Sequence, residues 1–266
     1  MIAHPSLRRL LPPLLAFTAL LALWEVLARA DTSRARIIPA PSEVLAAMYR
    51  TRESLITAHI PITVLEALIG LGIAFMIGVA LAALLDFSPP LKRALYPLLV
   101  ISQTVPVIAI APVLILVFGF GIEPKIAVVV LFCFFPITVA MVDGLTGTDP
   151  DLVALLRAMN ATRWQTWRKV RLPAALPTMF SGLRIAATYS VGGAIIGEYI
   201  TAQYGLGQYL RSAYSTGQVD QGFAAIVITA ALSIGLVLAV MIIERLMLPW
   251  YFTGAREAQW NEPGIY

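Results

Sequence analysis

Polar side chains within two long apolar runs are the residues of this sequence best suited to contact a solute. One group lies in the run at 95–118 and the other in the run at 176–199. A polar group is costly in lipid, so it usually faces a water-filled cavity or bonds to a neighbouring helix. Both alternatives are open for Gln103 and Thr104 in the first run and for Tyr189, Ser190 and Glu198 in the second, and Pro106, which can bend the first run, is a further candidate for the path.

Acidic residues near the ends of the apolar runs allow several interpretations. Glu198 could line a solute path, cap an outer loop or pair with Arg211. Three further carboxylates lie where water is within reach, so we expect them to be solvated: Glu66, Asp143 and Glu244. Gly193 and Gly197 form a pair of small residues four apart, which is typical of close packing between membrane helices.

Catalytic and metal-binding patterns are missing from the sequence. It contains no His-Glu-x-x-His pair, no glycine-flanked serine and no Gly-Lys dipeptide of an ATP-binding loop. Cys133 is the single cysteine, and the two histidines, His4 and His59, lie far apart. The sequence therefore predicts a protein that is not an enzyme and that binds no metal or cofactor of its own.

The composition indicates that lipid is the solvent around these residues. Apolar residues make up 59% of the 266 residues and charged residues 13%, against about 45–50% and about 25% in soluble domains. Six apolar runs are each long enough to cross a bilayer as a helix. They predict an all-α, polytopic membrane bundle forming one domain over residues 1–266, with spans at about 10–28, 61–85, 95–118, 124–143, 176–199 and 222–243.

The distribution of basic residues predicts the orientation. With the N-terminus inside, 12 of the 19 Lys and Arg residues fall on the cytoplasmic side, including those of segment 144–175. Both termini are then cytoplasmic, and the net charge of +4 reflects loop charges rather than nucleic-acid binding. The first run resembles a signal peptide ending at Ala28-Arg29-Ala30, but its length, Trp24 and Glu25 favour a retained helix.

Segment 144–175 is the one long polar connection between spans. Asp149-Pro150 is typical of a helix start, residues 151–159 place leucines on one face, and Asn160 can adopt the left-handed turn that ends a helix. A second short helix is predicted over 162–170, and Pro173 and Pro177 should break it before the fifth span. Such a pair of amphipathic helices could dock a partner or rest on anionic lipid.

A resemblance favours the docking alternative. Residues 149–177, DPDLVALLRAMNATRWQTWRKVRLPAALP, resemble the cytoplasmic signature loop of binding-protein-dependent ABC importer permeases. The family pattern Glu-Ala-Ala, three residues, Gly, nine residues, Ile, one residue, Leu-Pro falls on Ala154–Leu156, Asn160, Val170 and Leu172-Pro173 with its spacing intact. The leading Glu and the Gly are replaced. Residues 182–186 and the Gly-Leu-Gly at 205–207 resemble the nitrate, sulfonate and taurine branch, and segments 102–112 and 176–190 resemble permeases for thiamine-precursor pyrimidines.

The resemblance implies a type I importer fold and a permease subunit in the bacterial cytoplasmic (inner) membrane. Its partners would be two cytoplasmic ATPase subunits that use ATP and Mg, an extracytoplasmic solute-binding protein, and a second permease copy in a homodimer or pseudo-dimer. A short coupling helix would contact the ATPase through Leu155, Arg157, Ala158, Asn160, Ala161, Arg163, Trp164 and Pro173. A stand-alone secondary transporter or channel is the alternative, although no repeated halves are visible.

Overall fold

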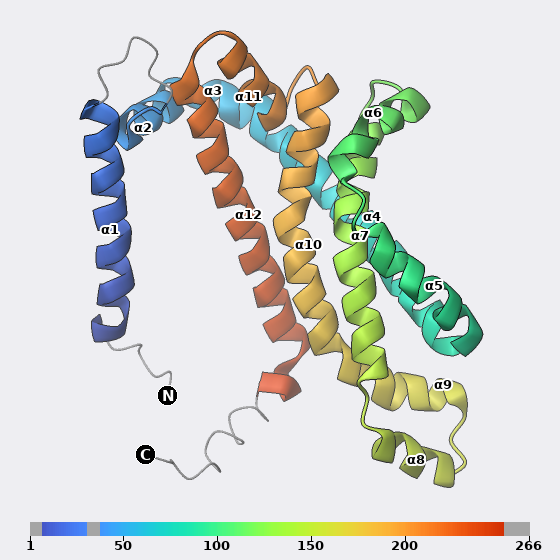
Figure 1. Ribbon diagram of the computed structural model, residues 1–266. Coiled ribbons are helices and arrows are strands. Elements are labelled where there is room, and N and C mark those ends of the chain that lie inside the picture. The colour runs from blue at the N-terminus through green and yellow to red at the C-terminus, as the bar shows by residue number, and fades with distance from the viewer. Residues whose placement is uncertain (1–6, 31–37, 253–266) are drawn as a thin grey trace.

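A computed structural model describes residues 7–30 and 38–252, and every regular element in these ranges is a helix. Figure 1 shows long helices running between two ends of the molecule, with short helices lying across each end. The elements are α1 (Leu7–Ala30), α2 (Pro41–Arg50), α3 (Arg52–Ser54), the π-helix η1 (Leu55–His59), α4 (Ile60–Phe87), α5 (Pro89–Ser102), α6 (Val107–Phe118), α7 (Glu123–Thr146), α8 (Pro150–Ala158), α9 (Arg163–Thr166), the π-helix η2 (Trp167–Arg171), α10 (Leu172–Thr201), α11 (Leu206–Ser215) and α12 (Val219–Met247).

Five helical stretches are long and apolar enough to cross a membrane, and a bent pair of shorter helices brings the number to six in the described ranges. The stretches are Leu11–Ala30, Arg52–Phe87, Glu123–Thr146, Arg163–Ile200 and Val219–Met247, and the pair is α5 with α6. The six predicted spans are therefore all present, and the all-α membrane bundle is confirmed.

The third span is broken, whereas the sequence pattern predicted one helix over 95–118. Helices α5 and α6 meet at an angle of 101°. Between them, the backbone N–H and the hydroxyl of Thr104 both donate to the carbonyl of Ile101, at 3.0 and 2.8 Å. Pro106 then has an extended backbone and no N–H to continue the helix. The chain therefore turns at residues 103–106.

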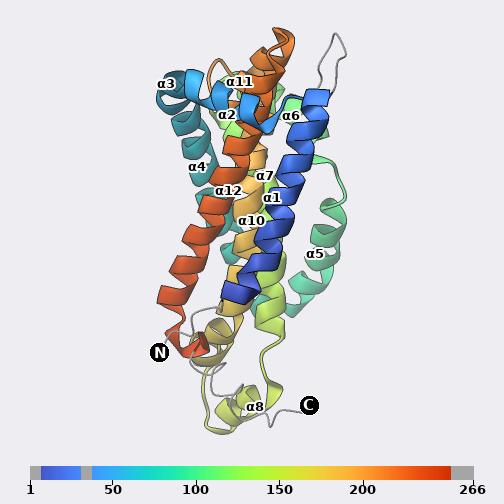
Figure 2. The ribbon, with the colours of Figure 1, turned by 90° about the vertical axis from the view of Figure 1, so that its left-hand side faces the viewer.

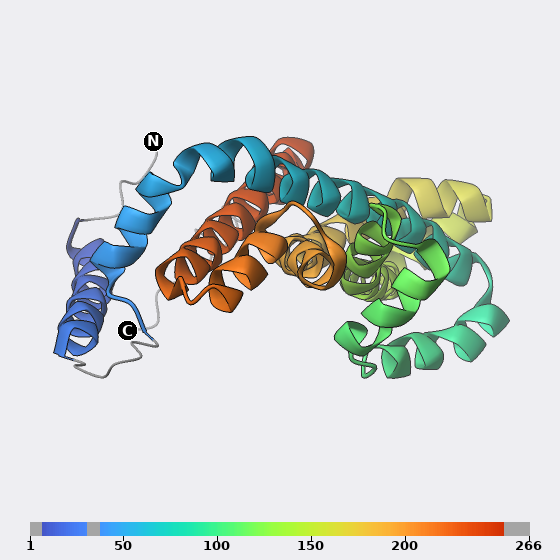
Figure 3. The ribbon, with the colours of Figure 1, turned by 90° about the horizontal axis from the view of Figure 1, so that it is seen from above.

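Helices α4, α7 and α10 form the packed centre of the bundle, and Figure 3 shows α12 on one side of it and α5 and α6 on the other. Small residues allow the close approach. A Cβ added at Gly193 would lie 3.1 Å from the ring of Phe132, and one at Gly197 would lie 3.0 Å from Cα of Lys125. The predicted packing role of these two glycines is confirmed, and their partner is α7.

The helix continues through Pro173 and Pro177, contrary to the sequence prediction, and a π-helical turn precedes the first of these prolines. Residues Arg163–Ile200 form one continuous helical stretch through α9, η2 and α10. A proline ring in an α-helix clashes with the carbonyl four residues earlier, and the wider π turn of η2 lies directly before Pro173. The same arrangement recurs where η1 precedes Pro61. Both helices thereby continue past a proline.

The short helices α2, α3 and α11 lie together at the end of the molecule opposite α8, and we call them the collar. Val44 and Ala47 of α2 are buried against Ala224 of α12. Helix α1 stands apart from the central bundle, as Figures 1 and 3 show, although it overlaps the other helices in the side view of Figure 2, and it is joined to α2 mainly through the carboxylate of Glu25. That carboxylate accepts from the hydroxyl of Ser42 at 2.7 Å and from Nε of Arg29 at 2.6 Å.

Candidate solute path and coupling hairpin

The coupling hairpin, defined as α8, α9 and η2 (residues 150–171), has the local structure that its sequence predicts. The side chain of Asp149 caps α8 by accepting from the backbone N–H of Asp151 at 2.8 Å. Asn160 has a φ of 59° and is the non-glycine residue with positive φ among those described. Thr162 and Gln165 then form a reciprocal capping box at the start of α9. Asn160 thus makes the left-handed turn for which the family pattern has glycine.

One face of the hairpin is apolar and exposed. Leu152, Leu155 and Met159 have 48%, 57% and 70% of their surface accessible. They follow the spacing of a single helical face, and Ala158 beside them is also exposed. Helix α8 itself lies at the far end of the molecule, beyond the ends of the long helices, as Figure 1 shows. It therefore offers an apolar surface of about two helical turns to a partner.

The hairpin is fixed to the C-terminal end of α4 by an ion pair and by stacked rings. Nη1 of Arg171 donates to both carboxylate oxygens of Asp86, at 2.6 and 2.8 Å. Trp164 and Trp167 stack with their ring centroids 5.2 Å apart, and Phe87 lies 5.5 Å from Trp167. Since α10 continues directly from η2, the hairpin is tied to two spans.

The predicted coupling residues divide between two sides of the hairpin. Leu155 and Ala158 are exposed on the outer side, and Trp164 belongs to the aromatic stack. Pro173 lies in the first turn of α10. Arg157, Ala161 and Arg163 line a cavity of about 320 Å³ between the hairpin and the junction of α4 with α5. Asn160 forms the turn beside this cavity.

Helix α10 carries an unpacked stripe despite its central position. Four side chains at helical spacing are exposed along it: Ser181, Ile185, Thr188 and Tyr189. A Cβ at Gly192, the next position on this stripe, would meet no atom within 4 Å. Polar groups at membrane depth are expected to face water or another polypeptide. The stripe is therefore the open side of α10 in the described ranges.

The other predicted path residues lie in different surroundings. Gln103, Thr104 and Pro106 are exposed at the break between α5 and α6. Ser190, by contrast, is fully buried, and its hydroxyl donates to the carbonyl of Ala187 at 2.9 Å. In this conformation Tyr189, on the exposed stripe, and the three residues of the break are open to an occupant, whereas Ser190 is not.

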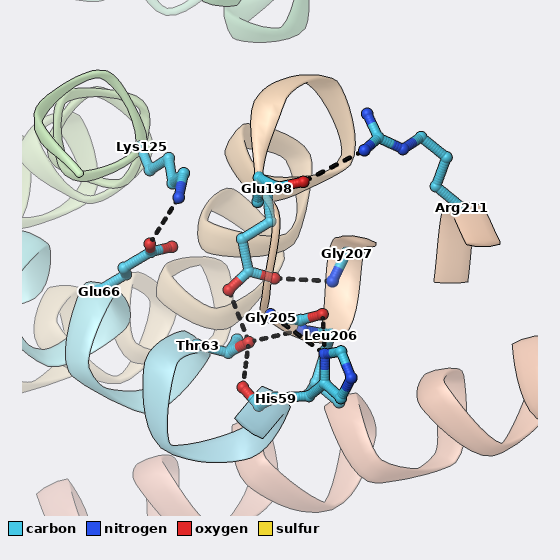
Figure 4. A network of polar contacts seen from close by, with 10 residues as sticks. His59, Thr63, Glu66, Lys125, Glu198, Gly205, Leu206, Gly207 and Arg211 are labelled. Carbon is cyan, nitrogen blue, oxygen red and sulfur yellow. Dashed lines mark hydrogen bonds and ion pairs between the residues drawn. The ribbon is translucent and has the colours of Figure 1, made fainter. Parts of the chain in front are cut away.

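Glu198 caps the outer loop, and Figure 4 shows its surroundings. Its carboxylate accepts from the hydroxyl of Thr63 at 2.6 Å and from the backbone N–H of Gly207 at 2.7 Å. Thr63 also accepts from the backbone N–H of Leu206 at 2.9 Å. The alternative pairing with Arg211 is wrong, because that guanidinium donates to backbone carbonyls at the end of α10. Glu198 is therefore buried and satisfied.

Thr63 and His59 were missed as members of this network. His59 Nδ1 lies 2.9 Å from the carbonyl oxygen of Gly205, and Gly205 itself has a φ of 112°. The sequence signal for the network was Glu198 followed by the Gly-Leu-Gly motif. Nothing in the sequence pairs that motif with the start of α4.

Two of the three carboxylates expected to be solvated are buried. Glu66 is fully buried with Nζ of Lys125 3.3 Å from its carboxylate, and Glu244 is 4% exposed with Nη1 of Arg184 at 3.7 Å. Both lie within helices that pack against the centre, where a basic partner offsets part of the cost of burial. Asp143 is exposed and accepts from the hydroxyl of Tyr96 at 2.8 Å.

Metal chemistry has no support in the described ranges. They contain no group of three His, Cys, Asp or Glu side chains positioned to hold a metal ion.

These features define a class: a multi-pass transport permease whose polar hairpin projects from one end of the bundle. Comparison with known proteins gives the family. Residues 74–252 match the family described as "Binding-protein-dependent transport system inner membrane component". The chain belongs to this family and is an ABC importer permease subunit of the inner membrane.

The relatives support this membership. The chain is 41% identical to a probable ABC transporter permease protein of Haemophilus influenzae, over 85% of this chain and 92% of that protein. It is 38% identical to the formylaminopyrimidine transport permease protein ThiX of Halalkalibacterium halodurans, over 90% and 96%. Permeases named for aliphatic sulfonates, taurine and nitrate also match. These relatives are named as transport permeases, not as enzymes, and they confirm the predicted branch.

A solved structure shares the fold. The inward-facing MetNI methionine ABC transporter matches with a TM-score of 0.64 and 22% identity, over 74% of this chain and 97% of that one. The type I importer architecture that the resemblance implied is therefore confirmed.

Proposed function

We propose that this chain forms half of a solute path and transmits the movement of a cytoplasmic ATPase to it. The observation that carries the proposal is the coupling hairpin, whose apolar face is exposed although its other side is tied to α4 and α10. An apolar face of this kind suits a protein partner. The ties to α4 and α10 give a push on the hairpin a direct route to the path.

The partners follow from the family. Two ATPase subunits, which use ATP and Mg, bind the hairpins of two permease copies, and an extracytoplasmic binding protein delivers the solute. We place both termini and the hairpin in the cytoplasm, since this orientation puts most basic residues inside. The second copy is most simply another of the same chain, because the stripe on α10 needs a partner surface on its open side. Nothing in the relatives named above supports the alternative of a stand-alone secondary transporter.

For the cargo, we propose a neutral heterocycle of the formylaminopyrimidine class. The 38% identity to a formylaminopyrimidine permease extends over 90% of the chain. The exposed side chains of the α10 stripe and the α5–α6 break are uncharged: Ser181, Thr188, Tyr189, Gln103 and Thr104. A hydroxyl- and amide-lined path suits a neutral ring with hydrogen-bonding edges, and a cation beside it, Arg184, is held by the hydroxyl of Ser181 at 3.0 Å and by the carboxylate of Glu244 at 3.7 Å.

The coupling role is tested by the double variant Leu155→Asp/Ala158→Asp. Two carboxylates on the exposed apolar face would have to lose water on docking, so we expect capture of the ATPase by the permease to be abolished. The membrane bundle should still elute as a single species in size-exclusion chromatography, because neither side chain packs against it. Leu155→Met keeps the apolar surface and serves as the control. Native-like, ATP-driven uptake in proteoliposomes by the double variant would disprove the coupling role.

The cargo is tested by uptake into proteoliposomes that contain the permease, its ATPase and its binding protein. We expect ATP-dependent uptake of labelled formylaminopyrimidine. Taurine or nitrate, each in about hundredfold excess, should not compete with it. Competition by taurine would reassign the cargo to the sulfonate class and leave the coupling role intact.

A further inference from the structure

The cavity behind the coupling hairpin has a composition that the transport function does not require. It has a volume of about 320 Å³ and lies between α8 and α9 on one side and the α4–α5 junction on the other, at the end of the bundle where Figure 1 shows α8 and α9. Four of its lining side chains are cationic and one is anionic: Lys92, Arg157, Arg163 and Arg171 against Asp86. The cavity therefore has an excess of positive charge.

That excess is not neutralised within the described part of the chain. Arg171 forms an ion pair with Asp86 through two short hydrogen bonds, so these two charges neutralise each other. Lys92 donates to the neutral hydroxyl of Thr146. No ion pair involves Lys92, Arg157 or Arg163 in the described ranges. Three cations around one cavity repel each other and favour an anion between them.

Helix α8 separates this cavity from the surface proposed for the ATPase. Val153 and Arg157, four residues apart on α8, line the cavity, and Ala161 joins them from the turn after the helix. Leu152, Leu155 and Met159 are exposed on the other side. An ATPase that covers the apolar face therefore need not cover Arg157, which is exposed on the cavity side of α8.

The cavity also lies at the level where a bilayer has its headgroups. Phe87 and Leu85 of its lining belong to the last turn of the apolar span α4. Leu84, in the same turn, is 53% exposed, as expected for a side chain in contact with lipid. The stacked rings of Phe87, Trp164 and Trp167 adjoin the cations. Tryptophan is enriched at this depth of a membrane protein.

We propose that this cavity binds the phosphodiester of an anionic phospholipid, with Arg157, Arg163 and Lys92 as its ligands. Guanidinium groups match phosphate oxygens in geometry and charge. Basic pockets at the cytoplasmic ends of membrane helices are known to hold such headgroups. The acyl chains would lie against the exposed side of α4. A lipid held there would brace the hairpin against the membrane, and the site requires only that the chain span a bilayer.

The test is native mass spectrometry of the full-length permease, delipidated in detergent and titrated with phosphatidylglycerol, phosphatidylcholine or inorganic phosphate. We expect phosphatidylglycerol to bind about tenfold more tightly than phosphatidylcholine, and inorganic phosphate not to be retained. Arg157→Gln/Arg163→Gln should lower the affinity for phosphatidylglycerol by about tenfold, because each arginine contributes a charge-assisted contact. Arg168→Gln/Lys169→Gln removes the same charge from exposed positions of the hairpin outside the cavity and should leave that affinity unchanged.

Three outcomes would overturn the proposal. Equal binding of the two lipids would show that the headgroup is not recognised. Equal losses in the two double variants would reduce the effect to the net charge of the hairpin. If Arg157→Gln/Arg163→Gln impaired capture of the ATPase but left phosphatidylglycerol binding unchanged, the cavity would instead receive an acidic segment of the ATPase. Since lipid binding is measured on the permease itself, a failure here is distinct from a failure of ATPase coupling.

Discussion

At the residue scale, Glu198 connects three segments that are distant in the sequence. Its carboxylate joins α10 to Thr63 in α4 and to the start of α11 at Gly207. A buried carboxylate is costly unless its oxygens are hydrogen-bonded, and both oxygens of Glu198 accept. The closure of the outer end of the bundle therefore depends on this side chain.

We expect Glu198→Ala to destabilise the permease, because it leaves the backbone N–H of Gly207 without its acceptor and leaves the hydroxyl of Thr63 with only the carbonyl of His59, at 3.2 Å. Each unsatisfied buried donor costs about 1–3 kcal/mol. Glu198→Gln keeps one acceptor oxygen and should fall between Glu198→Ala and the native chain. Thermal unfolding in detergent, followed by the loss of the monodisperse peak, measures the order of the three proteins. Glu53→Ala, at an exposed position of the same end, is the control, and an unfolding midpoint for Glu198→Ala equal to that of the control would contradict the network's structural role.

At the element scale, glycines set the distance of α7 from its neighbours. A Cβ at Gly70 would lie 2.5 Å from Cβ of Val129, whereas a Cβ at Gly72, two residues further along α4, would meet nothing within 4 Å. One glycine is thus required by packing and the other is not. This difference arises from the side of α4 that faces α7.

The pair Gly70→Ala and Gly72→Ala tests this packing on a single helix. Both variants gain up to about 1 kcal/mol from the higher helix propensity of alanine. Gly70→Ala also forces α4 away from α7, and overpacking of this kind costs about 1–3 kcal/mol. We therefore expect a lower unfolding midpoint for Gly70→Ala and an unchanged or higher one for Gly72→Ala in the same thermal assay. Equal midpoints would mean that the two helices adapt without cost.

The elements of the coupling hairpin were predictable because their signals are local. Asp149-Pro150, Asn160 and the Thr162–Gln165 box each act on a backbone group within three residues. The continuation of the helix through Pro173 was not predictable from residue type. It depends on the π turn of η2. The contacts that hold η2 in place, an ion pair with Asp86 and a ring contact with Phe87, come from another helix.

At the scale of the whole molecule, the hairpin and the collar lie at opposite ends of the bundle, as Figure 1 shows. This separation lets one end meet an ATPase and the other a solute-binding protein. It also makes the proposed orientation directly measurable. Cys133 is the single cysteine of the sequence and is fully buried, so the native chain should resist aqueous thiol reagents.

We expect Ser212→Cys, at the collar end, to react with a membrane-impermeant maleimide on intact cells. Arg168→Cys, on the hairpin, should react only after the cells are permeabilised. Both positions are exposed, so access across the membrane is the remaining variable, and the native chain controls for reaction at Cys133. Labelling of Arg168→Cys on intact cells would place the hairpin outside and remove the basis of the coupling proposal.

The sequence by itself showed that the chain lies in lipid, and it located the six spans and the coupling hairpin. It could do so because the length of an apolar run and the identity of a capping residue act locally. Only the tertiary structure decided which polar residues are open and which are closed. Glu198 and Thr63 are 135 positions apart, and the partners of Glu66 and Glu244 come from other helices. Helix packing brings such residues together, and that packing depends on which face of each helix meets its neighbour. For the same reason Ser190, on the packed face of α10, is buried, whereas the adjacent Tyr189 is exposed.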